Sequence, residues 1–351
     1  SLMTFEGLEK IEIQQAVTGD IVAVSGISNP VIGETISDIL SPSPLPLLDI
    51  EEPTIRMSFM VNNSPFAGKE GEFKTSRQIR DRLYRELETD MALFVEDDSS
   101  GGWTVSGRGE LHLAILIERM RREGYEFQVA RPQVISKMVD GKELIPYERI
   151  FIEVPEEFSG TVMQKMGIRR GELKDMTVVN GIAFMEFIIS TRGLFGYRSE
   201  FVTDSKGLGI INASFYHYGE DNGYSHDRQQ GSLVAHESGV TTQYGLTNIQ
   251  DRGLLFVGPA IKVYKGQVIG QNAKKEDLAV NVCRLKNLTN MRSKGDGTSE
   301  YFKTPKEMGL EDAIEYISDN ELVEVTPKSV RIRKVILDET EERKRRSQNR
   351  P

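Results

Sequence analysis

The sequence has few of the residues that form disulfides, metal sites and membrane spans. Its one cysteine, Cys283, cannot form an internal disulfide, which suits a reducing compartment. None of the four histidines stands beside another histidine, a cysteine or an acid at zinc-ligand spacing. No run approaches the roughly 20 apolar residues that span a bilayer, and no signal peptide opens the chain. These absences predict a cytoplasmic protein without a metal site and without a membrane partner.

Motifs of catalysis and nucleotide binding are also missing. The sequence has no G-x-x-x-x-G-K-[ST] phosphate loop and no G-x-S-x-G nucleophile elbow. Gly207-Leu208-Gly209 lacks the third glycine of a dinucleotide fingerprint and leads into an expected strand. Carboxylates are plentiful, but no spacing pairs two of them across a pocket. We therefore predict no catalytic site and no cofactor in this chain.

Charge is unevenly distributed along the 351 residues, whose formal net charge is -9. Residues 1–60 carry nine acids against Lys10 and Arg56, whereas residues 262–306 carry ten Lys/Arg against four acids. A second basic cluster occupies residues 343–346. Such a distribution allows a local patch to meet phosphate while the whole molecule stays acidic. A solvated face is the alternative explanation, and the sequence alone leaves both open.

The chain begins with short apolar runs and glycines, as in the last strands of a small β-barrel. Residues 1–48 are assigned to this barrel end, with a strand expected at Ile21–Val24. Four prolines follow and indicate a linker, because proline supplies no amide donor for a sheet or helix interior. They are Pro42, Pro44, Pro46 and Pro53.

Two successive segments, 49–137 and 138–219, each repeat the order β-α-β-β-α-β of a ferredoxin-like sandwich. In the first, Ile55, Met57, Phe59 and Val61 alternate as a half-buried strand, and two amphipathic helices follow. In the second, Asn180-Gly181 predicts a tight hairpin, because both residues tolerate positive φ. A single helix is expected over residues 193–205.

Residues 220–351 show mixed helix and strand signals, with a helix expected at 310–317, a strand at 330–336, a basic loop at 284–306 and a charged tail. Their topology does not follow from the pattern. The expected fold is therefore an α+β multidomain protein. It contains the end of a β-barrel, two ferredoxin-like (split βαβ) sandwiches and a mixed α/β C-terminal domain.

Four runs are specific enough to indicate a family. The first is VNNSPFAGKEG at 61–71, followed by TSRQIRDRL at 75–83. The second is GRGELHL at 107–113. The third is STRGLFGYRSEF at 190–201, with FYHYG at 215–219. The fourth is LTNMR at 288–292, with ELVEVTP at 321–327.

Together these runs resemble the BipA/TypA family of translational GTPases, over about residues 5 to 346. GRGELHL alone is common to translational GTPases. Elongation factor G carries a further domain between its domains III and V, for which this chain leaves no room. LepA is the weaker match, since its C-terminal region lacks the run at 288–292.

The resemblance implies that residues 1–48 end domain II, that the two sandwiches are domains III and V, and that 220–351 is specific to the family. It also implies a C-terminal fragment, without the domain that would bind GTP and Mg and carry the GTPase activity of the full-length parent. The implied partners are the ribosome, both subunits included, rRNA and A-site tRNA. The implied role is in translation, ribosome assembly or stress adaptation, as a monomer.

The basic loop contains the expected RNA-binding residues. Arginine and lysine supply cations for phosphate, while asparagine and threonine can bind 2′-hydroxyls or base edges. The candidates are Arg284, Lys286, Asn287, Thr289, Asn290, Arg292 and Lys294.

Two secondary basic surfaces are also possible. Arg77 and Arg80 lie on an expected helix beside Arg82 and Arg85, where they could equally pair with nearby acids. Arg343, Lys344, Arg345 and Arg346 could add electrostatic affinity or belong to a disordered tail. On fold alone, tandem ferredoxin-like domains also serve as protein-interaction or ligand-sensing modules without RNA binding. That alternative stays open.

Overall fold

The structure is a computed structural model, which describes all residues except 8, 29, 31, 47–51, 100, 225–227, 286–301, 339, 342–343 and 345–351. The chain forms two compact units, Ser1–Ile50 with Glu88–Met91, and Glu51–Leu87 with Ala92–Pro351. The first unit contains a three-stranded antiparallel sheet in the order β2-β1-β3. Its strands are β1 (Leu2–Glu6), β2 (Glu9–Glu12) and β3 (Val22–Val24). Its assignment to a β-barrel stays a prediction.

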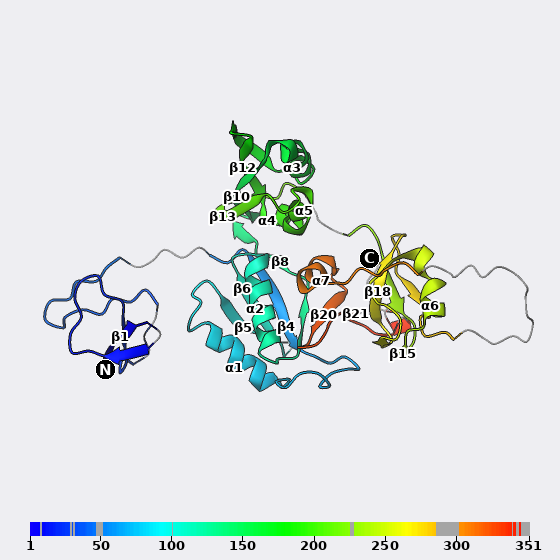
Figure 1. Ribbon diagram of the computed structural model, residues 1–351, viewed down its shortest axis with the longest axis horizontal. Helices are drawn as coiled ribbons and strands as arrows, with labels where there is room; N and C mark the ends of the chain where they lie inside the picture. The colour runs from blue at the N-terminus through cyan, green and yellow to red at the C-terminus, as the bar shows by residue number, and fades with distance from the viewer. Residues whose placement is uncertain are drawn as a thin grey trace, which may run out of the picture. The chain divides into compact units, whose positions relative to one another are not determined.

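The first sandwich of the larger unit has the strand order β7-β4-β6-β5, with every neighbouring pair antiparallel. This order confirms the predicted split βαβ arrangement (Figure 1). Its elements are β4 (Ile55–Val61), α1 (Ser76–Glu86), β5 (Phe94–Asp97), β6 (Trp103–Gly107), α2 (Glu110–Arg122) and β7 (Phe127–Ala130).

The start of α1 is fixed by a capping box. The Thr75 hydroxyl accepts a hydrogen bond from the Gln78 amide at 3.4 Å, and Gln78 Oε1 accepts one from the Thr75 amide at 3.0 Å. Two amide donors that a helix N-terminus leaves unpaired are thereby satisfied.

The second sandwich has the equivalent order β11-β12-β10-β13. Asn180 and Gly181 adopt φ of 52° and 78°, so the predicted hairpin is confirmed. The elements are β10 (Lys142–Pro155), α3 (Glu156–Ile168), β11 (Glu172–Val179), β12 (Ile182–Ser190), α4 (Thr191–Leu194), α5 (Tyr197–Asp204) and β13 (Ile210–Glu220), with β9 (Lys137–Val139) paired to β10.

The helix expected over 193–205 is divided into α4 and α5. Gly196 has φ of 69°, in the left-handed region that an α-helix cannot contain and that favours glycine. Phe195, just before it, turns toward the first sandwich and packs against that sandwich's core. The break therefore brings the two sandwiches into contact.

Residues 232–282 form a lobe with a hydrophobic core of its own, which includes Leu233, Leu246, Ile269 and Val282. Within it β15 pairs only with β17, apart from the larger sheet. The elements are β14 (Ser232–Ala235), β15 (Gly239–Val240), α6 (Gln243–Thr247), η1 (Gln250–Arg252), β16 (Gly253–Leu255), β17 (Lys262–Val263), β18 (Gln267–Asn272) and β19 (Leu278–Val280).

The last elements join this lobe to the first sandwich. They are α7 (Leu310–Tyr316), β20 (Glu321–Val325) and β21 (Val330–Lys334). Strand β20 pairs with β7 of the first sandwich and with β21, and β21 pairs with β18 of the lobe. One sheet therefore runs through the first sandwich and the lobe. A short strand, β8 (Gln133–Val134), pairs with β4. Side chains of α7 and β20 lie in the core of the first sandwich. The segment 220–351 therefore shares a core with 49–137, and the domain limits themselves stay predictions.

A bilayer-spanning helix is not found in the part of the chain that the structure describes.

Candidate functional site

Most of the predicted RNA-binding loop lies outside the described residues, namely Lys286, Asn287, Thr289, Asn290, Arg292 and Lys294. Arg284 is described and exposed. Its carbonyl accepts a hydrogen bond from the Thr242 hydroxyl at 2.6 Å. On the other side of the loop, the Lys303 amide donates to Gln250 Oε1 at 3.1 Å. Both ends of the loop are thus attached to the lobe near α6 and η1.

The secondary candidates lie on the surface beside acids. Arg77 and Arg80 are exposed on α1 and pair with Asp81 at 3.8 Å and Asp97 at 3.3 Å. The Arg80 guanidinium also lies 4.5 Å from the centre of the Tyr84 ring. In the tail, Lys344 is described and exposed, and Arg343, Arg345 and Arg346 lie outside the described residues.

Arg82, from the same run as Arg77 and Arg80, has a structural role instead. It is buried and donates to Glu123 at 2.5 and 2.8 Å and to Glu86 at 2.6 Å. The hydrogen bonds from Arg82 lower the pKa of the Glu123 carboxyl. The helical spacing of the arginines could not separate this buried member from its exposed neighbours.

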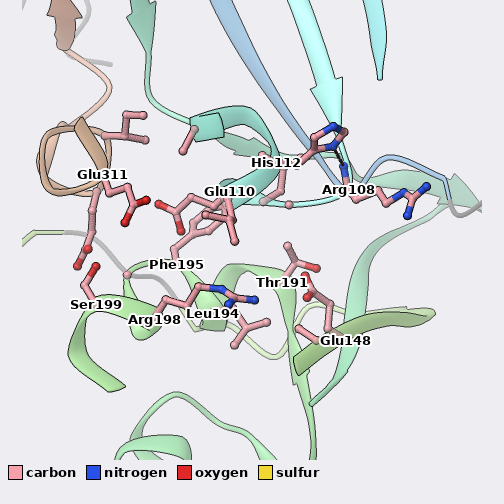
Figure 2. A pocket seen from close by; sticks show the side chains of 18 of the residues that line it. Arg108, Glu110, His112, Glu148, Thr191, Leu194, Phe195, Arg198, Ser199 and Glu311 are labelled. Atoms are coloured by element: carbon pink, nitrogen blue, oxygen red, sulfur yellow. Dashed lines mark hydrogen bonds between the residues drawn. The ribbon is translucent and has the colours of Figure 1, made fainter. Parts of the chain in front are cut away.

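A pocket of about 220 Å³ lies where the second and third sequence runs meet. The first turn of α2, the α4–α5 turn and helix α7 all contribute to its wall (Figure 2). Apolar side chains such as Ile55, Leu194 and Ile314 share this wall with the charged Glu110 and Glu315. We name this cavity the junction pocket. Both runs indicated the family, but nothing in their residue pattern predicted a pocket between them.

Glu110 is the first residue of α2, and its carboxylate accepts a hydrogen bond from the Gly196 amide. Removal from water raises the pKa of Glu110 to about 7, and the charges of Glu315 and Glu311 add to the effect, partly offset by Arg198. Burial likewise raises the pKa of Glu315, which accepts a hydrogen bond from Ser199. The acidic end of the junction pocket therefore favours neutralised carboxyls or a bound cation.

The backbone conformation favours glycine at position 196. Its φ of 69° lies in the left-handed region, which strains other residues. A Cβ here would also meet the Glu315 carboxylate, but that flexible side-chain end could move aside.

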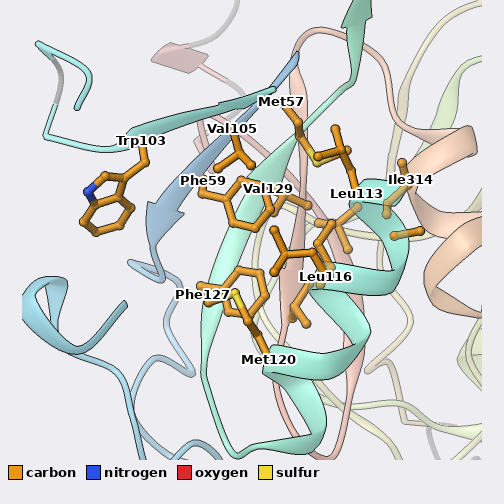
Figure 3. Packing of buried hydrophobic residues seen from close by; sticks show 14 of the residues in the cluster. Met57, Phe59, Trp103, Val105, Leu113, Leu116, Met120, Phe127, Val129 and Ile314 are labelled. Carbon is orange, nitrogen blue, oxygen red and sulfur yellow. The ribbon is translucent and has the colours of Figure 1, made fainter. Parts of the chain in front are cut away.

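The core of the first sandwich fixes the position of α2 and hence of Glu110. Leu113, Leu116 and Met120 face the sheet and pack against Phe59 and Phe127 (Figure 3). The two phenylalanine rings are stacked with centroids 5.6 Å apart. Because interiors of this kind are close-packed, α2 presents Glu110 to the pocket from a rigid support.

The first sequence run forms a loop around a buried carboxylate. Glu126 is fully buried and accepts hydrogen bonds from Gly68 N at 2.6 Å, Gly71 N at 2.8 Å and Asn62 Nδ2 at 2.8 Å. A Cβ on Gly71 would lie 2.3 Å from the Cβ of Glu126. The glycines of this run therefore let the backbone approach the carboxylate.

Residues 321–327, the described part of the fourth run, are hydrogen-bonded to the first run. Glu324 is fully buried and accepts hydrogen bonds from Asn62, Ser64 Oγ at 2.9 Å, Tyr264 Oη at 2.7 Å and Arg331 Nη1 at 3.2 Å. These partners come from the first sandwich, the lobe and β21. Both runs therefore join parts of the fold, a role that depends on contacts across some 260 residues of sequence.

No group of three or more His, Cys, Asp or Glu side chains that could hold a metal ion occurs among the described residues.

Comparisons with known proteins match two parts of the chain to families. Residues 230–339 match the TypA/BipA C-terminal domain, and residues 144–228 match the elongation factor G C-terminus. The second match covers most of the second sandwich, and the first covers the lobe, α7, β20 and β21.

Relatives that match nearly the whole chain indicate the same family. A large ribosomal subunit assembly factor BipA of Synechocystis sp. is 51% identical over 336 residues, 95% of this chain and 56% of that protein. The factor of the same name from Bacillus subtilis is 47% identical over 97% of the chain and 56% of the relative. A putative TypA-like elongation factor of Arabidopsis thaliana chloroplasts is 48% identical over 94% of this chain and 49% of that protein. The chain thus spans about half the length of these relatives and, as the sequence runs predicted, belongs to the TypA/BipA family.

Proposed function

We propose that this chain is the ribosome-binding C-terminal region of a translational GTPase, acting in large-subunit assembly or translation through contacts with rRNA and A-site tRNA. The observation that carries the proposal is the 51% identity, over 95% of the chain, to a protein named large ribosomal subunit assembly factor. In the whole protein, GTP hydrolysis with bound Mg would belong to a further domain.

Two features support the loop as the proposed RNA contact. Its ends are held on the lobe, and the exposed Arg284 and Lys303 lie at those two ends. Cations at the base and within the loop suit a phosphate backbone, and the asparagines and threonine between them suit ribose or base edges. We assign the contacts to the seven residues predicted from the sequence, Arg284, Lys286, Asn287, Thr289, Asn290, Arg292 and Lys294. Arg77, Arg80 and the cluster at 343–346 are assigned a secondary contribution.

The test is co-sedimentation of the 351-residue chain with ribosomes and with isolated large subunits over a series of salt concentrations. Replacing Lys286, Arg292 and Lys294 together by glutamine is expected to weaken pelleting and flatten its salt dependence. Each lost phosphate contact should reduce the slope of log K against log salt by about 0.7–0.9, and three by roughly 2–3.

A matched control removes three exposed cations that have acidic partners: Arg122 beside Glu118, Lys142 beside Glu220 and Lys174 beside Glu172. Equal losses from both triple variants would reduce the effect to net charge and contradict the loop assignment. Absence of pelleting at low salt would contradict ribosome binding by this chain. The protein-interaction or ligand-sensing alternative would then be favoured, because it requires neither ribosomes nor salt dependence.

A further inference from the structure

The sheet of the second sandwich has one face covered by its helices and one face that exposes aromatic rings. Strands β10 and β12 direct alternate side chains, such as Ile150 and Met185, into the core that α3 and α5 complete (Figure 1). The side chains between them point to the opposite face, where Phe151 is 45% exposed and Phe184 is 38% exposed. Tyr216 of β13 is 47% exposed. We name this side of the sheet the open face.

The equivalent face of the first sandwich is polar. Its central strands β4 and β6 place Arg56 opposite Ser106 and Ser58 opposite Thr104. Because the two sandwiches share one strand order, the fold itself does not require aromatic side chains on this face. Grouped apolar side chains that stay exposed commonly mark a surface that contacts a partner.

One cation already lies among the rings of the open face. The guanidinium carbon of Arg149 is 5.3 Å from the centre of the Tyr216 ring and 5.9 Å from that of Phe151. Its Nε is also 2.7 Å from Glu186 Oε1, on the neighbouring strand β12. A cation over a ring is attracted by the negative face of the ring, and a nearby carboxylate adds to this attraction. The open face therefore combines the two groups that hold a cation.

Carboxylates outnumber cations on the open face. Its charged side chains, with Lys174 at the bulge of β11, are Arg149, Glu153, Glu172, Lys174, Asp175 and Glu186. The strand register places Glu153 directly opposite Phe184, so a carboxylate stands beside an exposed ring. Four acids against two bases repel the phosphates of a nucleic acid and attract a cationic partner.

Exposed aliphatic side chains complete the open face. Ile182 precedes Phe184 by two residues along β12, and Ile210 lies opposite Glu153; both isoleucines are exposed. Lysine and arginine carry long aliphatic stems that cover apolar surface while their charged heads reach other groups. A segment rich in these two residues therefore suits the rings, the isoleucines and the carboxylates together.

We propose that the open face binds a basic, extended segment of a partner protein. The charged heads of its lysine or arginine side chains lie over Phe151, Phe184 and Tyr216. They also pair with carboxylates such as Glu153, while their stems cover the isoleucines. This inference goes beyond the proposed function and does not depend on RNA binding by the basic loop.

Fluorescence anisotropy with the 351-residue chain tests the proposal. The probe is a labelled six-residue peptide of alternating lysine and arginine with blocked termini. A peptide with glutamine at every position and labelled hexauridine RNA are the comparison ligands. The basic peptide is expected to bind, and the glutamine peptide at least tenfold more weakly, because it lacks the cations. Absence of binding by the basic peptide would overturn the proposal.

Removing rings at constant charge locates the binding. Phe151→Thr combined with Tyr216→Thr keeps β-branched residues on both strands and should leave thermal unfolding cooperative. The basic peptide should bind this double variant roughly five- to thirtyfold more weakly, as expected for the loss of two contacts between a cation and a ring. Phe94→Thr removes an exposed ring from β5 of the first sandwich and is the matched control, with unchanged affinity expected. Equal affinities of the double variant and the parent would refute the assignment.

A change of charge gives a second readout. Glu153→Gln keeps the shape of the side chain and should weaken the basic peptide roughly two- to fivefold. Glu157→Gln, an exposed change on α3, should leave the affinity unchanged, and equal losses in both variants would reduce the binding to net charge and contradict the open face.

Two other occupants of the open face are distinguished by the same double variant. If it loses hexauridine and keeps the basic peptide, the open face stacks RNA bases. If sedimentation equilibrium shows a dimer of the parent and a monomer of the double variant, the open face binds a second copy of the chain. Either result would overturn the proposal, and neither depends on the outcome of the salt series with ribosomes.

Discussion

Replacing Glu324 by alanine is expected to lower the free energy of unfolding by about 3–5 kcal/mol. The carboxylate is fully buried and accepts hydrogen bonds from Asn62, Ser64, Tyr264 and Arg331. In the alanine variant Arg331 keeps its ion pair with Glu70, but the buried donors of Asn62, Ser64 and Tyr264 lose this acceptor. Removing one partner of a buried charged pair costs far more than the pair contributes, because the other partner stays desolvated.

Urea unfolding followed by circular dichroism measures this change. Glu324→Gln should give an intermediate loss, since the amide oxygen still accepts hydrogen bonds but carries no charge toward Arg331. Glu307→Ala, an exposed change in the same part of the chain, is the matched control and should lie within about 0.5 kcal/mol of the parent. A loss below 1 kcal/mol in Glu324→Ala would show that the hydrogen bonds to Glu324 contribute little to the free energy of unfolding.

Replacing Glu110 by glutamine is expected to stabilise the chain at pH 8 by about 2–3 kcal/mol. Desolvation raises the pKa of Glu110 in the folded state to about 7, above its usual value of 4.5. Between these values the folded chain holds a proton that the unfolded chain has released, so stability falls as pH rises through this window. Glutamine does not titrate and avoids the loss, while its oxygen can still accept the Gly196 amide.

The gain should therefore shrink as pH falls and vanish below about pH 4.5, where the carboxyl is protonated in both states. Urea unfolding at pH 5, 6, 7 and 8 measures it as the difference between variant and parent. Glu315 and Glu311 on α7 and Arg198 on α5 face the same carboxyl, and this difference removes their own titration to first order. Glu157→Gln is the control, and a gain that does not depend on pH would contradict the desolvated state of Glu110.

Local sequence signals predicted the elements well where neighbouring residues decide the conformation. Alternation at 55–61 corresponds to β4, and Asn180-Gly181 forms the expected hairpin because two adjacent φ angles determine it. The repeated β-α-β-β-α-β order also confirmed both sandwiches, since this order of elements with short connections favours one compact pairing.

The expected helix over 193–205 failed for a tertiary reason. Its residues allow a helix, but Phe195 gains burial against the first sandwich when the chain turns at Gly196. That burial depends on a surface contributed by residues far away in the sequence. Periodicity within one segment carries no information about it.

The features of the candidate site also separate into those that local sequence indicates and those that need tertiary contacts. The charge of 262–306 and the four sequence runs indicated a family and a basic loop from composition and local motifs alone. The pairing of β20 with β7 and the meeting of Glu110 with Gly196 and Glu315 required the folded chain.

The sequence by itself therefore determined most elements of the two repeated sandwiches and the family, because these follow from local conformational preference and from specific residue runs. Tertiary structure alone decided which glutamates are buried, that β20 completes the first sandwich, and where the junction pocket lies. Burial and pairing are properties of surfaces contributed by distant segments, and one-dimensional spacing does not encode which surfaces meet.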